Sequence, residues 1–327
     1  MIALAARTLH KLREARHARL ARAVLETPPV RVRDDGVIVF SMVGTRVLLP
    51  YLVAAKSLDA RLGRGRFAVL DDGTLTAADR AVLAEHLDRP EIIAIDGVRP
   101  GPCPRGGCWE RLLTLLDLRR EAYVIQLDSD TVTLGPVDEV AAAIDAGRDF
   151  TLLGGSDARW LPASSYAADP ASLGPRAHIQ RLAEATLEQV EGGWPLPRHY
   201  VRGCAGFAGF APAGLGREVA EAWSRGAAAL LGARWGEWGS EQVMSNLIVA
   251  NEGEPMLLPY ERYLNFWNDP VPPRASFVHF VGTYRYHRGA YAEATRRAIA
   301  DLRAAQRRSS AAASPSRSRA NSASQPA

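Results

Sequence analysis

The alternation of apolar runs with helical patterns between residues 37 and 127 most constrains what this chain can fold into. The first run, "VIVFSMV" at Val37–Val43, is continuously apolar, which is typical of a strand buried on both faces of a parallel sheet. The same pattern predicts strands over 67–71, 91–95 and 123–127, with helices over 48–62, 76–87 and 109–118. Such alternation favours right-handed βαβ units, so we predict an α/β fold with a mostly parallel central sheet flanked by helices.

Carboxylates follow two of these predicted strands. Asp71 and Asp72 come after the second, and the run "YVIQLDSDTV" leads directly into Asp128 and Asp130. Parallel sheets bind ligands beyond the carboxyl ends of their strands. Ionised carboxylates one residue apart repel each other and resist loss of water. A metal ion, a shared proton or solvent at a surface loop could each compensate.

The segment from Asp128 to Val132 has two chemical interpretations. Two carboxylates on a loop can hold Mg²⁺ or Mn²⁺ through oxygen ligands, with the ion bridging to substrate phosphates. Alternatively, Asp-x-Asp-x-Thr/Val after an apolar strand matches the nucleophile loop of haloacid-dehalogenase-like phosphatases. That chemistry also needs a later lysine and a later acidic pair, and no lysine follows Lys56 in this sequence. We therefore rank the phosphatase below the metal site.

Charge is divided unevenly along the chain. The formal net charge of the whole chain is +4. Residues 1–33 have a net charge of +6 and residues 303–327 a net charge of +5, so residues 34–302 have a net charge of −7. An acidic centre argues against nucleic-acid binding, which needs a basic surface on the folded domain. The basic ends suit either plain solvent exposure or peripheral contact with an anionic membrane surface.

These patterns suggest three segments: a basic N-terminal helix and linker (1–33), one α/β domain (34–302) and a disordered Ser/Ala/Arg tail (303–327). The longest apolar stretch is interrupted by Arg46 and Pro50, so we expect no membrane span. The N-terminus lacks the apolar core of a signal peptide, which predicts a cytoplasmic protein.

Several motifs occur in a recognisable order. They are "FAVLDDGTLTAADRAVLAEHL", "CWERLLTLLDL", "YVIQLDSDTVTLGPVDEV", "CAGFAGF", "SEQVMSN" and "HFVGTYR", with a step of 17 residues from Arg111 to Asp128. In this order they resemble glycosyltransferase family eight, the glycogenin-like enzymes and bacterial lipopolysaccharide galactosyltransferases of GT-A fold. The resemblance covers about residues 37–290. It implies a metal-dependent transfer of a sugar from a nucleotide-diphosphate sugar, UDP by family default, to a saccharide or other acceptor.

The resemblance also implies roles for individual residues. Asp128, Asp130 and His279 would hold Mn²⁺ or Mg²⁺. Gln242 and Glu241 would be catalytic, beside the reacting carbon of the donor sugar. The remaining residues would bind the donor: Arg111, Asp71, Asp72, Asn246, Gly282 and Arg285. Family membership further implies retention of configuration and a setting in bacterial cell-surface glycan assembly.

Each role has a structural rival. His279 alone would suit a buried structural histidine, Arg111 an ordinary ion pair, and Asp71-Asp72-Gly73 a simple turn. Trp235, Trp238 and Trp267 suit either the core or the stacking of sugars. The alternatives at the level of function are a sugar nucleotidyltransferase, the phosphatase, and a non-catalytic module that binds a nucleotide sugar.

Two departures from the family concern the donor. Cys204 stands where the family has Asn, and Arg285 where it has Lys. The sequence therefore does not identify the donor sugar.

Overall fold

The computed structural model describes residues 2–174, 176–191 and 198–313, and the structural statements below refer to this part of the chain. Its central sheet has seven strands: β1 (Val37–Val43), β2 (Arg66–Asp71), β3 (Glu91–Ala94), β4 (Tyr123–Leu127), β6 (Phe150–Leu153), β9 (Gly203–Phe210) and β10 (Met256–Leu257). They lie in the order β10-β6-β9-β4-β1-β2-β3. Only β9 runs antiparallel to its neighbours, so the predicted α/β fold with a mostly parallel sheet is confirmed.

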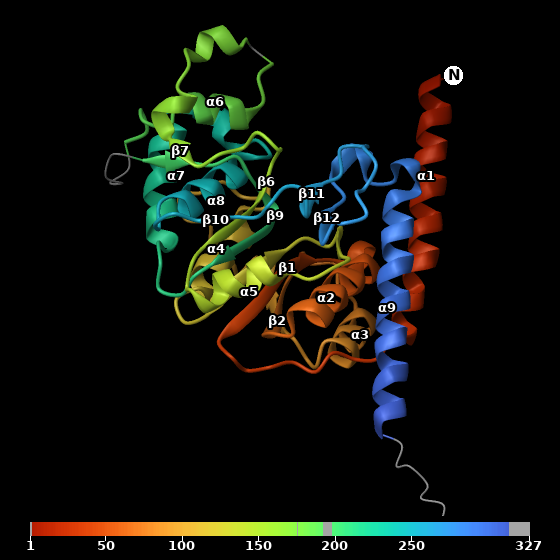
Figure 1. Cartoon of the computed structure of the whole chain (residues 1–327). Coiled ribbons are helices and arrows are strands. Elements are labelled where there is room, and N and C mark those ends of the chain that lie inside the picture. Colours follow the sequence, from red (N-terminus) through yellow and green to blue (C-terminus); the bar gives the residue numbers. More distant parts are fainter. Residues whose placement is uncertain (1, 175, 192–197, 314–327) are drawn as a thin grey trace, which may run out of the picture.

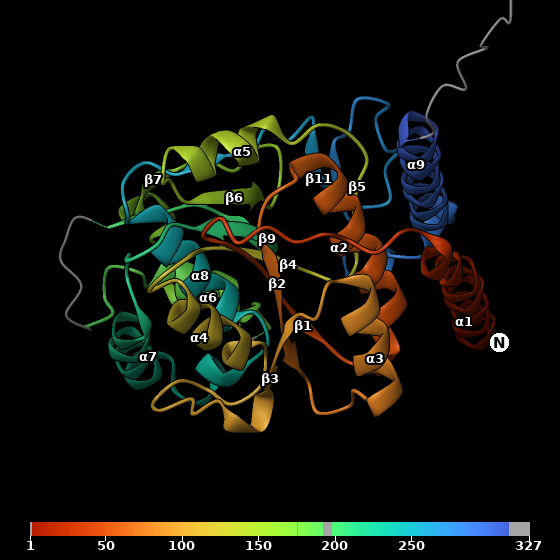
Figure 2. The ribbon, with the colours of Figure 1, turned by 90° about the horizontal axis from the view of Figure 1, so that it is seen from below.

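Helices cover both faces of this sheet, as Figures 1 and 2 show. One face packs against α2 (Leu48–Leu62), α3 (Ala77–His86) and α5 (Asp138–Asp145), and the other against α4 (Trp109–Leu118), α6 (Ile179–Ala185), α7 (Arg217–Leu231) and α8 (Ser240–Ala250). Along β1, Val37 and Val39 enter the first core, whereas Ile38 and Phe40 enter the second. Burial on both faces explains why the strand sequence is continuously apolar.

A second, three-stranded sheet extends the molecule beyond β4. It consists of β11 (Tyr263–Asn265), β12 (Phe277–His279) and β5 (Thr131–Thr133), in the order β11-β12-β5. A two-stranded sheet pairs β7 (Leu161–Pro162) with β8 (His199–Tyr200). Short 3₁₀ helices complete the connections: η1 (Arg22–Glu26), η2 (Thr45–Val47), η3 (Ile95–Gly97), η4 (Ala163–Tyr166), η5 (Pro170–Leu173), η6 (Gly232–Gly236), η7 (Gly282–Tyr284) and η8 (His287–Gly289).

The two terminal helices, α1 (Ile2–Ala21) and α9 (Ala290–Ala313), run side by side along one flank of the domain (Figure 1). His17 Nε2 on α1 lies 3.0 Å from the hydroxyl of Thr295 on α9. An ion pair between Glu26 of η1 and Arg303 of α9 adds a second contact. Ala21 and Val24 belong to the main hydrophobic core. The N-terminal segment therefore packs onto the domain through these residues.

The C-terminal boundary also differs from the sequence-based expectation. Helix α9 continues to Ala313, past residue 303, where we expected the disordered tail to begin. The predicted tail from residue 314 onward lies outside the described residues. Among the described residues, no helix combines the length and apolar character needed to cross a membrane.

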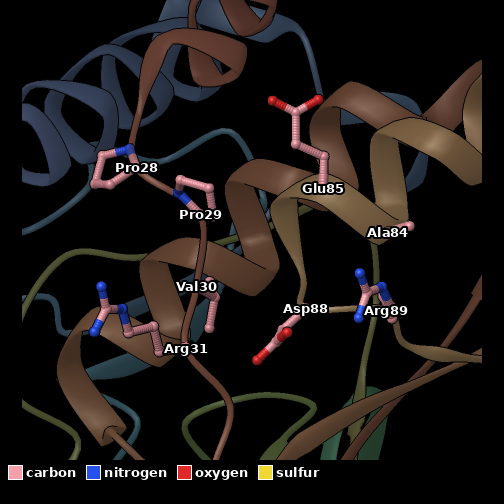
Figure 3. A pocket seen from close by; sticks show the side chains of 8 residues that line it. All are labelled: Pro28, Pro29, Val30, Arg31, Ala84, Glu85, Asp88 and Arg89. Carbon is pink, nitrogen blue, oxygen red and sulfur yellow. The ribbon is translucent and has the colours of Figure 1, made fainter.

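A hollow of about 710 Å³ lies between the segment that precedes β1 and the end of α3 (Figure 3). Val30 N donates to the carbonyl of His86 there, at 3.0 Å. Helix α3 leads back from the carboxyl end of β2, so this hollow lies at the opposite edge of the sheet from the strand ends that bind ligands. It is lined by Pro28, Pro29, Val30, Arg31, Ala84, Glu85, Asp88 and Arg89, none of which is a predicted site residue.

Candidate functional site

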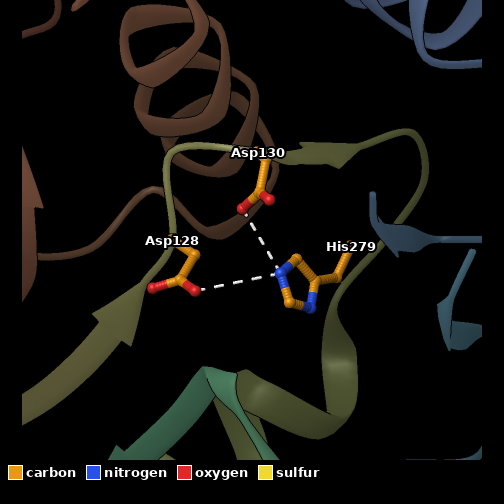
Figure 4. A group of neighbouring side chains, drawn as sticks. All are labelled: Asp128, Asp130 and His279. Carbon is orange, nitrogen blue, oxygen red and sulfur yellow. Dashed lines mark ion pairs between the residues drawn. The ribbon is translucent and has the colours of Figure 1, made fainter. Parts of the chain in front are cut away.

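The structure brings Asp128, Asp130 and His279 together at the carboxyl end of β4 (Figure 4). His279 Nε2 lies 3.3 Å from Asp130 Oδ1 and 3.8 Å from Asp128 Oδ2. One ligand atom from each of the three residues lies within 4.8 Å of the other two. Asp130 and His279 are buried, whereas the side chain of Asp128 is 26% exposed. The cluster is therefore an enclosed group with one accessible carboxylate.

Strand pairing explains this convergence. Asp128 directly follows β4, which lies beside β1. From β1 the chain continues to β2 on one side, whereas β4 lies on the other side of β1, so the strand order reverses between β1 and β4. This is the switch point at which open α/β sheets bind ligands. The chain then enters β5, and β12 pairs with it in antiparallel register, with His279 opposite Thr131. The amide of Phe280 donates to the carbonyl of Asp130 at 2.9 Å, which fixes the imidazole beside the second carboxylate.

Hydrogen bonds also fix which imidazole nitrogen faces the carboxylates. Asn265 Nδ2 donates to the carbonyl of Leu153, so its Oδ1 faces His279 Nδ1 at 2.9 Å. An amide oxygen only accepts, so Nδ1 carries a hydrogen. Cys204 Sγ lies 3.3 Å from the same nitrogen. The Nε2 atom is thereby left for the carboxylates or a cation, as in histidines that ligate metals.

Arginines and a buried glutamate continue the cluster on both sides. Arg111 pairs with Asp128 and also approaches Glu241 at 3.3 Å, while Arg285 pairs with Asp130. The result is a chain of alternating charges, Glu241–Arg111–Asp128–His279–Asp130–Arg285, at the edge of the sheet. The two guanidinium groups provide bidentate donors that suit a diphosphate.

The cluster shifts the pKa values of its members. Burial alone would lower the pKa of His279, but Cys204 and the Asp130 carboxylate raise it well above its ordinary value. Burial alone would raise the pKa of Asp130, but the charges of His279 and Arg285 lower it. Burial raises the pKa of Glu241 to about 7, although Arg111 opposes this. These shifts show that the site favours a positively charged group between the carboxylates of Asp128 and Asp130.

Two carboxylates and one imidazole match the ligand preferences of Mn²⁺, and the carboxylates those of Mg²⁺. Gly206 supports the fit, because a Cβ there would lie 2.4 Å from His279 Cε1. The imidazole of His279 therefore occupies the space that a side chain at residue 206 would need. Asp128, Asp130 and His279 therefore fit a divalent cation.

Other predicted residues lie next to the cluster. Gln242 Oε1 accepts from the backbone of Ala205 at 3.3 Å, and Asn246 Nδ2 donates to the carbonyl of Gly203 at 3.2 Å. Both line a cavity of about 530 Å³. Gly282, with a φ of 41°, lines a smaller cavity of about 280 Å³ together with Asp130 and Arg285.

Asp71 and Asp72 lie apart from these contacts. Asp71 Oδ1 accepts from the amides of Gly73 and Leu75, and its other oxygen pairs with Arg80. Asp72 Oδ1 accepts from the amide and hydroxyl of Thr74. Apart from the pairing of Asp71 with Arg80 of α3, the contacts described for both carboxylates lie within their own turn. This agrees with the structural interpretation of the segment and gives no support to donor binding by these two residues.

The sequence analysis missed several residues of the site. Asn265 and Gly206 orient His279; the sequence did not mark Asn265, and Gly206 lay in the motif "CAGFAGF" without a role of its own. Glu14 and His10 of α1 line the smaller cavity beside Asp130, with Glu14 paired to Arg46 at 2.6 Å. The sequence pattern places α1 in a separate basic segment. It gives no sign of the contacts between α1 and the site, because these contacts join residues far apart in the sequence.

The sequence matches no family model, and it matches no curated protein sequence. Among solved structures, the chain resembles a glycosyltransferase GlyE of Streptococcus pneumoniae, with a TM-score of 0.49 and 11% identity over 85% of this chain and 64% of that one. It also resembles an active-site mutant of LgtC, with a TM-score of 0.45 and 16% identity over 82% of this chain and 95% of that one. A third similar structure is mouse xyloside xylosyltransferase 1, with a TM-score of 0.42 and 13% identity over 76% of this chain and 97% of that one. All three TM-scores are below 0.5.

Proposed function

We propose that this chain is a metal-dependent glycosyltransferase that moves a sugar from a nucleoside-diphosphate sugar to a saccharide or other acceptor. The observation that carries the proposal is the cluster of Asp128, Asp130 and His279 at the switch point of the sheet. Arg285 beside the cluster provides a second positive group for a diphosphate. The order of the sequence motifs supports the reaction class. Retention of configuration and a UDP donor are further parts of the proposal and rest on the family resemblance.

The roles of the side chains follow from their positions. Asp128, Asp130 and His279 would hold Mn²⁺ or Mg²⁺, which supplies charge to neutralise a leaving diphosphate. Arg285 would bind a phosphate oxygen once such a ligand competes for its pairing with Asp130. Arg111, held between Asp128 and Glu241, would orient the first carboxylate and contact the donor sugar. Gln242, on the cavity side of α8, would lie beside the sugar.

The rival enzyme functions gain less from the geometry. The phosphatase chemistry needs a lysine near the aspartates, yet Lys56 Nζ lies against the carbonyl of Thr27 and the ring of His86. These groups are at the far edge of the sheet. A sugar nucleotidyltransferase needs a basic glycine-rich loop after β1, where this chain offers one arginine, Arg46, which is paired with Glu14.

The test measures release of nucleoside diphosphate from UDP-glucose, UDP-galactose, UDP-N-acetylglucosamine and GDP-mannose, with Mn²⁺ or with EDTA. We expect metal-dependent hydrolysis of one donor, which Asp130→Asn abolishes and Asp96→Asn, at an exposed aspartate, leaves intact. Circular dichroism of both variants checks that they fold. Release of phosphate from small phosphoesters, without turnover of any nucleotide sugar, would replace the proposal with the phosphatase.

A further inference from the structure

Helix α1 forms an outer flank of the molecule, next to α9 (Figures 1 and 2). Its inner face points toward the domain, because His17 and Ala21 are buried and His10 and Glu14 are half-buried. These four positions recur at steps of three and four residues, which places them on one face of the helix. Through this face α1 contacts α9 and lines the cavity of about 280 Å³ beside Asp130.

The outward face of the same helix combines leucines with arginines. Its outer stripe consists of Leu9, Leu12, Arg16 and Arg19, which also recur at steps of three and four residues. All four side chains are exposed, Leu9 to 47% and Leu12 to 63%. Single exposed leucines are ordinary on protein surfaces, but burial of a leucine is favourable. Two of them in line with two arginines therefore form a surface that a partner could cover.

The positive charge around the outer stripe is not neutralised within α1. Residues 8–22 contain five lysine or arginine side chains and one carboxylate, that of Glu14. Glu14 lies on the inner face, where it pairs with Arg46 at 2.6 Å. Arg16 and Arg19 form no ion pair with another residue that the structure describes. The outer face of α1 therefore presents free positive charge together with apolar side chains.

A bilayer that contains anionic lipids would use both kinds of side chain. Leucines enter the boundary between headgroups and acyl chains, and basic residues attract anionic headgroups. Two leucines cover far less than the area of about 800 Å² per partner in a stable protein interface. A second copy of α1 on this stripe would also place like charges against one another. Nucleic acid would bind the arginines through its phosphates but would leave the leucines without a partner.

We propose that the outer stripe of α1 docks this protein peripherally on an anionic bilayer surface, with the helix axis parallel to the bilayer. Leu9 and Leu12 enter the headgroup boundary, and Arg16 and Arg19 contact lipid phosphates. The inner face of the same helix lines the cavity beside Asp130. Docking therefore holds this cavity about one helix diameter, 10–12 Å, from the bilayer.

The test is flotation of the full chain with vesicles of phosphatidylcholine alone, or of an equal mixture of phosphatidylcholine and phosphatidylglycerol. We expect the wild type to float only with the mixed vesicles, and less at high salt because salt screens the attraction. Arg16→Glu should weaken binding about tenfold, since one basic group near an anionic surface contributes a factor of about five and charge reversal adds repulsion. Leu12→Ser should weaken binding about fivefold, because it removes an apolar contact.

Two substitutions on α7 are matched controls. Arg225 and Leu230 are exposed on that helix, Leu230 to 44%. Arg225→Glu and Leu230→Ser therefore make the same chemical changes away from α1. Both variants should bind the mixed vesicles as tightly as the wild type. Circular dichroism checks that all four variants fold.

Three results would overturn the inference: no flotation with the mixed vesicles, equal flotation with the neutral ones, or equal losses in Arg16→Glu and Arg225→Glu. Sedimentation velocity and binding of duplex DNA, both without lipid, test the other occupants. A dimer that Leu12→Ser dissociates, or DNA binding that Arg16→Glu abolishes, without vesicle binding, would assign the stripe to a second copy or to nucleic acid. All samples contain EDTA and no nucleotide, so these outcomes are separate from those that test the glycosyltransferase.

Discussion

The Cα of Gly206 on β9 lies so close to the ring of His279 on β12 that a Cβ would come within 2.4 Å of Cε1 and 2.6 Å of Nδ1. Real Cβ atoms do not approach other atoms so closely. The two residues are far apart in sequence, and their strands belong to different sheets. The position of the imidazole beside Asp130 therefore depends on a missing side chain in another strand.

Replacing Gly206 with alanine is expected to displace the imidazole and weaken binding of Mn²⁺ by about 10- to 100-fold, the usual cost of disturbing the support of a metal ligand. Titration of Mn²⁺, followed by electron paramagnetic resonance of the free ion, measures this. Gly236→Ala is the control, because a Cβ there meets no atom within 4 Å. Equal affinity in both variants would show that His279 does not ligate the ion.

Much of the fold was predictable because local patterns and tertiary structure agree. The apolar run of β1 is continuous because both faces of the strand are covered. Thr76 marked the start of α3 because its side chain accepts a hydrogen bond from the amide of Asp79. The Asp79 carboxylate in turn accepts one from the amide of Thr76, which completes a capping box. The end of α9 was less predictable, because its last turns contain no apolar side chain larger than alanine.

The site was predictable only in part. Asp128 and Asp130 are marked by their place at a strand end, and His279 was linked to them through a motif order. Asn265 had no such signal, and the motif that contains Gly206 did not reveal its contact with His279, because both residues act between strands distant in sequence. Asp71 shows a different case: a carboxylate at a strand end accepts hydrogen bonds from its own turn and pairs with Arg80 of the following helix.

Asn265 provides an independent test of how His279 is oriented. Replacing it with alanine removes the acceptor of the Nδ1 hydrogen, so the hydrogen can move to Nε2 and block that atom as a ligand. We expect about tenfold weaker Mn²⁺ binding in Asn265→Ala, measured by the same titration. A thermal melt monitors the loss of its bond to Leu153. Unchanged affinity would mean that Cys204, 3.3 Å from Nδ1, orients the ring without the amide.

The contact of Glu14 with Arg46 predicts that α1 influences the cavity beside Asp130, where the proposed donor would bind. Glu14 adds a negative charge to the cavity beside Asp130 and occupies a guanidinium that could bind phosphate. We expect Glu14→Gln to strengthen UDP binding in the presence of Mn²⁺ by about 2- to 5-fold, as measured by calorimetry. Glu26→Gln is the matched control, since Glu26 pairs with Arg303 away from this cavity. Weaker binding in Glu14→Gln would instead make α1 a positive support of the site.

Lys56 predicts a pH dependence of stability that is separate from the site. Its ammonium group is buried between Thr27 and His86, and burial lowers its pKa to about 8, although Glu85 and Asp59 oppose this. In the unfolded chain the pKa is 10.5. Between these values the unfolded chain binds more protons than the folded one, so the free energy of unfolding rises with pH across this window.

We expect the free energy of unfolding of the wild type to increase by roughly 1–2 kcal/mol from pH 7.5 to 9.5, relative to Lys56→Met. Denaturant unfolding followed by circular dichroism at both pH values gives this difference. Lys11→Met is the control, because Lys11 is exposed on α1 and is the only other lysine in the sequence. The wild type and Lys11→Met should rise together. If Lys56→Met rises with them, Lys56 keeps an ordinary pKa in the folded chain, and another group causes the increase.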